Sequence, residues 1–180
     1  PHVFWEGTGV GIQGLLQIVT GSHDFEQVRA GLRRGIPEQA VVGLVGSQKA
    51  SYIAGVYREI QQKPGLSKRP LFVITYTTYQ AERLHLDLAD FIPEENLFFF
   101  PSQEVFAYEE VTRSLDILRD RLLAYAALVE RTTPVLIVPI HALAEKLIPP
   151  EVFLSASFGI DMDTRVDLET LASRLVAMGY

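Results

Sequence analysis

Apolar residues along the chain alternate between short unbroken runs and longer stretches with helical spacing. The short runs are expected to form strands, and they lie at 40–46, 71–76, 97–100 and 134–139. The run 71–76 is expected to be covered on both faces, as in a parallel sheet. Between them, apolar residues recur at intervals of three and four, which is the spacing of amphipathic helices. Strands that alternate with helices predict an α/β domain with a parallel sheet flanked by helices.

Helix-capping residues indicate where several of the helices begin. The expected helices are 25–32 after Ser22 or Asp24 with Gly35 as its end, 49–62, 79–91 after Thr77 or Thr78, 115–131 after Ser114, 141–147 with Pro149 and Pro150 as its end, and a last helix from 168 after Asp167. Residues 15–19 resemble a short helix or strand, 102–112 an irregular segment, and 158–163 a strand. The charged residues Asp116, Arg119, Asp120 and Arg121 are expected to form a solvent-facing set of i,i+4 pairs rather than a catalytic carboxylate pair.

Composition limits the class of protein. The chain has 180 residues, of which 48% are hydrophobic and 21% charged, as in ordinary soluble globular domains. Its net charge of −6 disfavours DNA binding by this piece alone. Because there is no cysteine and the four histidines lack ligand spacing, we expect neither a metal nor another cofactor. No run reaches the ~18 apolar residues of a membrane span and no signal peptide is recognisable, which indicates a cytoplasmic protein without membrane contact.

The stretch from Gly43 to Ser51 has the order of a phosphate-binding loop: a strand, a glycine turn, a lysine and a helix. A working loop reads Gly-x-x-x-x-Gly-Lys-[Ser/Thr]. Its glycines let backbone N–H groups surround phosphate oxygens, and its hydroxyl holds Mg²⁺. Gly43, Gly46, Ser47 and Lys49 keep the form of this loop.

Two replacements remove the parts of the loop that perform chemistry. Gln48 stands where the last glycine belongs, and a side chain there crowds the phosphate. Ala50 stands where the Mg²⁺ hydroxyl belongs, and Ser51 places a hydroxyl one residue late, about 100° further around the helix. The sequence therefore predicts a degenerate loop with no catalytic residue. The alternative is the plain strand–turn–helix of any α/β domain.

After Pro150 the alternation of strands and helices changes. The one strand and one helix expected there cannot bury an apolar core by themselves. We therefore expect 1–14 to be an N-terminal arm or leader, 15–156 a nucleotide-fold domain, and 157–180 the truncated start of a second α+β domain.

Several segments resemble the bacterial transcription-repair coupling factor (Mfd) family. The longest is Thr75-Tyr76-Thr77-Thr78-Tyr79-Gln80-Ala81-Glu82-Arg83-Leu84, with Asp87-Leu88 and Phe91 after it. The shorter ones are Phe100-Pro101, Asp116-Ile117-Leu118-Arg119-Asp120-Arg121, Val138-Pro139-Ile140-His141-Ala142-Leu143, Pro149-Pro150 and Met178-Gly179-Tyr180. Each motif is modest, but their order and spacing together are specific, and they cover residues 13–180.

The resemblance implies the N-terminal region of a large protein, similar to the excision-repair protein UvrB. It implies a P-loop NTPase-like fold of the UvrB domain 1a type, followed by a domain that contacts UvrA. The ATP-dependent DNA translocase motor, and the contacts with RNA polymerase and DNA, would lie in other domains of the parent protein. UvrB also has a tyrosine-rich hairpin that clamps DNA. At that place this chain has 102–112, with Phe106 and Tyr108 as its aromatics and three glutamates that would repel phosphates.

The leading hypothesis is a catalytically silent UvrB-like module that helps recruit UvrA for nucleotide excision repair at stalled RNA polymerase. Contact with UvrA is expected mainly through the second domain, where Arg165 and Arg174 are the candidate residues. Plain solvent-facing charges are the alternative for both arginines. Two other hypotheses are a residual ATP-binding or ATPase domain that uses Lys49 and Ser51, and an autoinhibitory domain that packs on the motor.

Overall fold

The computed structural model describes residues 11–65, 69–102, 111–130, 134–159 and 165–177. The chain divides into two compact units, 1–145 and 146–180, and each is described by itself. Within the described ranges, no helix is both long and apolar enough to cross a membrane. The expected functional domains at 1–14, 15–156 and 157–180 stay a prediction.

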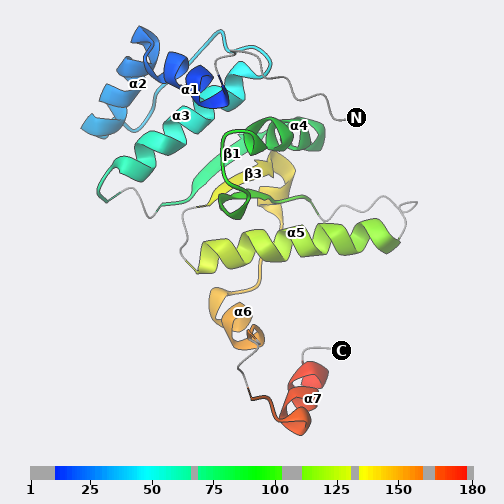
Figure 1. The fold of residues 1–180 in the computed structure, drawn as a ribbon. Coiled ribbons are helices and arrows are strands. Elements are labelled where there is room, and N and C mark those ends of the chain that lie inside the picture. The colour runs from blue at the N-terminus through cyan, green and yellow to red at the C-terminus, as the bar shows by residue number, and fades with distance from the viewer. Residues whose placement is uncertain (1–10, 66–68, 103–110, 131–133, 160–164, 178–180) are drawn as a thin grey trace, which may run out of the picture. The chain divides into compact units, whose positions relative to one another are not determined.

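Helices alternate with three short strands in the described part of the first unit (Figure 1). Its elements are α1 (Ile12–Thr20), α2 (His23–Arg34), α3 (Gln48–Gln62), β1 (Leu71–Thr75), α4 (Thr78–Ala89), the 3₁₀ helix η1 (Glu94–Asn96), β2 (Leu97–Phe99), α5 (Val111–Val129), β3 (Val135–Pro139) and the 3₁₀ helix η2 (Ile140–Ala144). The described part of the second unit contains α6 (Pro150–Ala156) and α7 (Leu168–Ala177).

The three strands form one parallel sheet in the order β1-β3-β2. Leu71 of β1 and Leu97 of β2 are both in register with Val135 of β3. The connections from β1 to β2 and from β2 to β3 contain α4 and α5. This arrangement confirms the expected α/β class with a parallel sheet flanked by helices.

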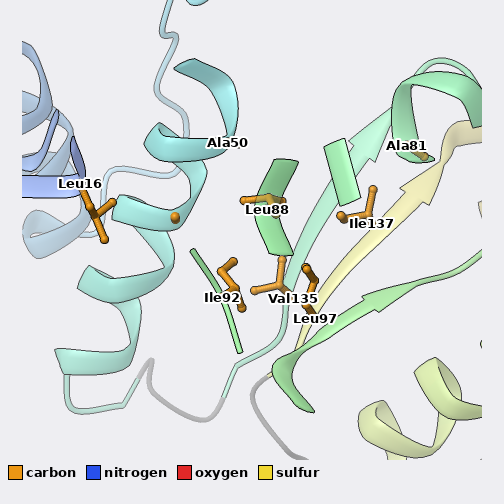
Figure 2. Packing of buried hydrophobic residues seen from close by; sticks show 9 residues of the cluster. Leu16, Ala50, Ala81, Leu88, Ile92, Leu97, Val135 and Ile137 are labelled. Atoms are coloured by element: carbon orange, nitrogen blue, oxygen red, sulfur yellow. The ribbon is translucent and has the colours of Figure 1, made fainter. Parts of the chain in front are cut away.

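The central strand β3 divides the core of the first unit into two layers. All five of its residues are buried, and successive side chains point to opposite faces of the sheet. Val135 and Ile137 pack in a cluster with residues of α1, α3 and α4 (Figure 2). Leu136 and Val138 pack in a second cluster that includes Ala124 of α5. Helices therefore cover both faces of β3. The prediction that the run 71–76 is covered on both faces is wrong, because β1 lies at the edge of the sheet and its Phe72 and Ile74 are 44% and 53% exposed.

The predicted helix caps form where side-chain oxygens meet free backbone donors. Ser22 Oγ accepts the N–H of Phe25 at 3.2 Å, and α2 ends at Gly35, whose φ is +72°. Thr77 Oγ1 accepts the N–H of Gln80 at 3.2 Å at the start of α4. In the second unit, the carboxylate of Asp167 accepts the N–H of Thr170 at 2.9 Å, and hydrogen bonds from Thr170 lower the pKa of Asp167.

The first of the four predicted strands is wrong. Residues 40–46 form no strand, and β1 is paired with β3 alone. Val42 and Val45 lie 89% and 71% exposed, so this apolar run is not buried. A strand requires a partner for its backbone groups, and no other described strand lies beside this segment. The apolar pattern of 40–46 indicates a tendency to form a strand, but it does not show whether a neighbouring strand is present to pair with it.

Smaller differences concern helix ends. Residues 15–19 are helical as part of α1, and α5 begins at Val111, before the predicted cap Ser114. The helix expected at 141–147 is the 3₁₀ helix η2. Pro150 begins α6 instead of ending a helix, because proline suits the first turn, where its missing N–H has no partner to lose.

Of the strand expected at 158–163, Phe158 and Gly159 are not in a strand and 160–163 lie outside the described residues. Most of the irregular segment 102–112 also lies outside them.

Helices α2 and α3 approach closely at a glycine. The ring of Phe25, which is fully buried, packs edge-on against Tyr52, with 5.1 Å between ring centroids. A Cβ at Gly55 would lie 2.8 Å from Phe25 Cε2 and 3.0 Å from Thr20 Cγ2. Arg29 of α2 adds a salt bridge of 2.7 Å to Glu59 of α3. Gly55 therefore permits the contact that joins α2 to the rest of the core.

We expect Gly55→Ala to destabilise the protein. Alanine favours a helix by about 1 kcal/mol over glycine, but overpacking a rigid core costs about 1–3 kcal/mol. Because Phe25 is enclosed, the steric cost should prevail. Urea unfolding should therefore give a lower free energy of unfolding for the variant. Gly159→Ala is the matched control, since a Cβ there meets nothing within 4 Å. An unchanged or increased stability of Gly55→Ala would show that the helices separate without cost.

Candidate functional site

The loop predicted at residues 43–51 follows an unpaired segment and runs into helix α3. Gly43 and Gly46 have φ values of +84° and +52°, in the left-handed region where glycine is favoured. The helix begins at Gln48, and Lys49 is exposed in its first turn. The structure thus keeps a glycine turn and a helix N-terminus, but the strand that should lead into the turn is absent.

The backbone of the turn bonds mainly to itself. The N–H of Gln48 donates to Val45 O at 3.1 Å, and the N–H of Lys49 donates to Gly46 O at 3.3 Å. The N–H of Val45 donates to the side-chain oxygen of Gln48 at 3.2 Å. Gln48 stands in the position of the last glycine. Its side-chain carboxamide therefore accepts the hydrogen bond of the Val45 N–H, which is then not available to a ligand.

The hydroxyl of Ser51, which the alternative of a residual ATPase would use, is bonded within the protein. Ala50 is fully buried and Ser51 is buried beside it. Ser51 Oγ donates to the backbone oxygen of Gln48 at 3.0 Å. Ser47, just before α3, makes no side-chain capping bond. Of the predicted loop residues, Gly43, Gly46, Ser47 and Lys49 line a common cavity, whereas Ala50 and Ser51 face the core.

The cavity beside the loop has a volume of about 600 Å³. It is bounded by the 41–49 segment, α3, the carboxyl end of β1 and α4. Ligands of parallel sheets bind beyond the carboxyl ends of strands, so its position agrees with a ligand site. Its lining mixes aliphatic side chains with Lys49, Arg83 and Asp87. The chemistry of these walls is thus more apolar than that of a phosphate cradle.

The two candidate partner-binding arginines lie in the second unit. Arg165 and Arg174 are both exposed. The guanidinium carbon of Arg174 lies 4.2 Å from the centroid of the Phe158 ring, within the range of a cation–π contact. This stacking limits the freedom of Arg174 while it leaves the charge accessible. The role of both residues stays a prediction.

A buried ion pair that the sequence patterns did not predict lies beyond the carboxyl ends of β2 and β3. Arg121 of α5 is 5% exposed, so its assignment to a solvent-facing helix face is wrong. Its Nη1 lies 2.7 Å from Glu145 Oε2 and donates to Pro101 O at 2.7 Å. Its guanidinium also stacks 4.2 Å from the centroid of the Phe100 ring, and Ser102 Oγ donates to Glu145. Burial lowers the pKa of Arg121, and the charge of Glu145 partly offsets this effect.

The helical spacing of residues along α5 could have indicated that Arg121 is buried. Arg121 lies three residues before Ala124, on the stripe of α5 that faces the sheet. The run of charges that precedes it conceals this periodicity, and Glu145 is too distant in sequence for a local rule to find. The pair connects the segments that follow β2 and β3, so its role in this structure is to hold the edge of the sheet.

We expect Arg121→Ala to lower the free energy of unfolding by about 2–4 kcal/mol, because it leaves the carboxylate of Glu145 half-buried without its cation. The control is Arg119→Ala, on the same helix, whose side chain is exposed. Thermal and urea unfolding of both variants measure the difference. Equal, small losses in the two variants would mean that the buried pair contributes no more than a surface charge.

Comparison with known proteins places the chain in a family. No family model matches it and no solved structure matches it. It is 29% identical over 169 residues to the transcription-repair-coupling factor of Bacillus subtilis (strain 168), a match that covers 94% of this chain and 14% of the relative. It is 31% identical over 140 residues to the protein of the same name in Staphylococcus aureus (strain USA300), covering 78% of this chain and 11% of the relative.

The chain therefore spans a small part of the curated relatives that it matches. The alignments nevertheless cover 94% and 78% of the chain itself. The similarity is therefore not a chance match to one short motif. As the counterpart of one segment of these proteins, the chain belongs to the family of the transcription-repair-coupling factors.

Proposed function

We propose that the chain is a catalytically silent, UvrB-like module of a transcription-repair coupling factor. Its role is to help recruit UvrA for nucleotide excision repair at stalled RNA polymerase. The parent protein is an ATP-dependent DNA translocase whose motor, and whose contacts with DNA and RNA polymerase, lie outside this chain. The proposal rests on the family and on one observation at the loop, the bond between Gln48 and Val45.

That bond supports a silent loop because it places a neutral acceptor on a backbone donor inside the loop. In a working loop the backbone N–H groups converge on the phosphates. Here the N–H of Val45 bonds to the Gln48 carboxamide at 3.2 Å. A nucleotide would have to displace this side chain and would then find no hydroxyl at Ala50 for Mg²⁺. Both losses reduce affinity and leave the metal without its ligand.

A second candidate function is nucleotide binding without hydrolysis. It is favoured by Lys49, which is exposed and lines the cavity of about 600 Å³. The alkyl part of the lining could hold a base, and the ammonium group a phosphate. The two candidates differ in what a titration with nucleotide should give.

We expect no saturable binding of Mg²⁺–ATP by the chain at micromolar concentrations in isothermal titration. The variant Gln48→Gly restores the last glycine of the loop and should bind more tightly, because it frees the Val45 donor. Lys49→Ala in the background of Gln48→Gly should abolish this gain. Saturable micromolar binding by the natural sequence would establish nucleotide binding and exclude a silent loop.

Recruitment of UvrA would use a surface that resembles the one UvrB presents. Among the described residues from 157 onward, the part that the resemblance assigns to partner contact, Arg165 and Arg174 are exposed cations. Arg174 stacks on Phe158, so ordering its side chain in a complex costs less entropy than for a free arginine. Two exposed cations on a chain of net charge −6 are suited to an acidic patch on a partner.

We expect the complete N-terminal region of the parent protein to retain UvrA in a pull-down and this chain alone to retain less. In the larger protein, Arg165→Ala/Arg174→Ala should weaken UvrA retention about tenfold, the equivalent of about 1.4 kcal/mol. The control is Arg58→Ala/Arg119→Ala, which removes two exposed charges from α3 and α5. Equally tight binding by the region and by this chain would contradict the placement of the surface, as would equal effects of the two double variants.

A further inference from the structure

Helix α5, which runs beside the sheet of the first unit (Figure 1), is apolar on the side that faces the sheet and also on the side that faces away from it. Ala124 and Tyr125 are buried toward the sheet. Leu122 and Leu123 lie on the other side of the helix, where they are 45% and 47% exposed. A helix that is apolar all round is typical of an interior position. The outward face of α5 is therefore suited to contact with another surface.

Five residues define this outward face: Arg119, Leu122, Leu123, Ala126 and Glu130. At 3.6 residues per turn, Arg119 lies one turn before the two leucines and Glu130 one turn after Ala126. Helical bonding extends to Glu130, because its N–H donates to Ala126 O at 2.9 Å. The outward face thus carries an exposed cation, two leucines, a small residue and an exposed anion, in that order.

The two charges at the ends of the outward face have no ion-pair partner among the described residues. Arg119 and Glu130 are separated by about 16 Å along the helix, too far to pair with each other. Glu130 also lies at the C-terminal end of α5, where the helix dipole is negative and a cation is favoured. A contact that brings a cation to Glu130 would therefore be favourable.

We propose that the outward face of α5 pairs with the same face of a second copy of this chain. The two helices run antiparallel about a two-fold axis that passes between residues 124 and 125. In this register Arg119 of one copy meets Glu130 of the other, and Leu123 meets Ala126. A two-fold axis repeats each contact, so that two ion pairs flank an apolar centre. A large side chain opposite a small one lets the helices approach closely.

The order of the charges identifies the partner as a second copy. A helix face with a cation at one end and an anion at the other is complementary to itself when it is reversed. Exposed ion pairs contribute little free energy, so the charges set the orientation and burial of the leucines supplies most of the affinity. A single helix face is smaller than the roughly 1,200–2,000 Å² of stable complexes, so the dimer should dissociate on dilution. The pairing goes beyond the proposed recruitment of UvrA and does not depend on the loop.

Sedimentation velocity of this chain between about 5 and about 500 μM tests the dimer. The weight-average mass should rise from the 20.1 kDa of one chain toward twice that value. A mass that stays at 20.1 kDa over the whole range would overturn the proposal.

Charge reversal tests the antiparallel register. Arg119→Glu and Glu130→Arg should each weaken the association about tenfold, because like charges then meet at both ends of the interface. The double variant Arg119→Glu/Glu130→Arg should restore it, because both ion pairs form again with their signs exchanged. A double variant that associates no better than the single variants would contradict the register and with it the proposal.

A pair of leucine variants separates pairing from the stability of the single chain. Leu123→Asp should abolish the rise in mass but leave the dilute chain folded, as measured by circular dichroism and thermal unfolding. The control is Leu86→Asp, on the 63% exposed Leu86 of α4, which should still associate. Equal association by the two variants would overturn the proposal. A much larger loss of stability in dilute Leu123→Asp than in Leu86→Asp would show that another part of the same chain covers this face, and would exclude the second copy.

Discussion

Burial of β3 on both faces is the constraint from which the first unit is built. Val135 and Ile137 organise the layer of α1, α3 and α4, while Leu136 and Val138 organise the layer of α5. Neither layer can form without this strand, because the helices bury their apolar stripes against it. The strand is also central in the sheet, so both β1 and β2 depend on its backbone groups for pairing.

At the loop, a single side chain determines what the backbone can offer. A helix N-terminus with glycines before it attracts anions in general, and this chain retains that geometry at Gly43 and Gly46. The carboxamide of Gln48 changes the chemistry, because it satisfies the Val45 donor from inside the loop. The glycine turn and the helix N-terminus are thus kept, while the Gln48 side chain changes which backbone donors the loop can offer to a ligand.

Sequence reasoning predicted the parts of the structure that local rules determine. The caps at Ser22, Thr77 and Asp167 follow from side chains that reach their own backbone, and β3 follows from its unbroken apolar run. The exception at residues 40–46 shows the limit, because a strand exists only with a neighbour and the neighbour is not encoded locally. The pair Arg121–Glu145 escaped for the same reason, since its partners are remote in the sequence. In the candidate site, the sequence alone shows that Gln48 and Ala50 depart from the phosphate-loop consensus. It does not show that the Gln48 side chain turns back to the N–H of Val45.

The buried guanidinium of Arg121 also has a mechanical meaning. It joins Pro101 after β2, its own position on α5, and Glu145, the last residue of the first unit. Tension applied to the chain beyond Glu145 therefore loads a side-chain clamp before it reaches the hydrogen bonds of β3. The pairing of β3 with β1 and β2 is therefore shielded from a force that acts on the residues beyond Glu145.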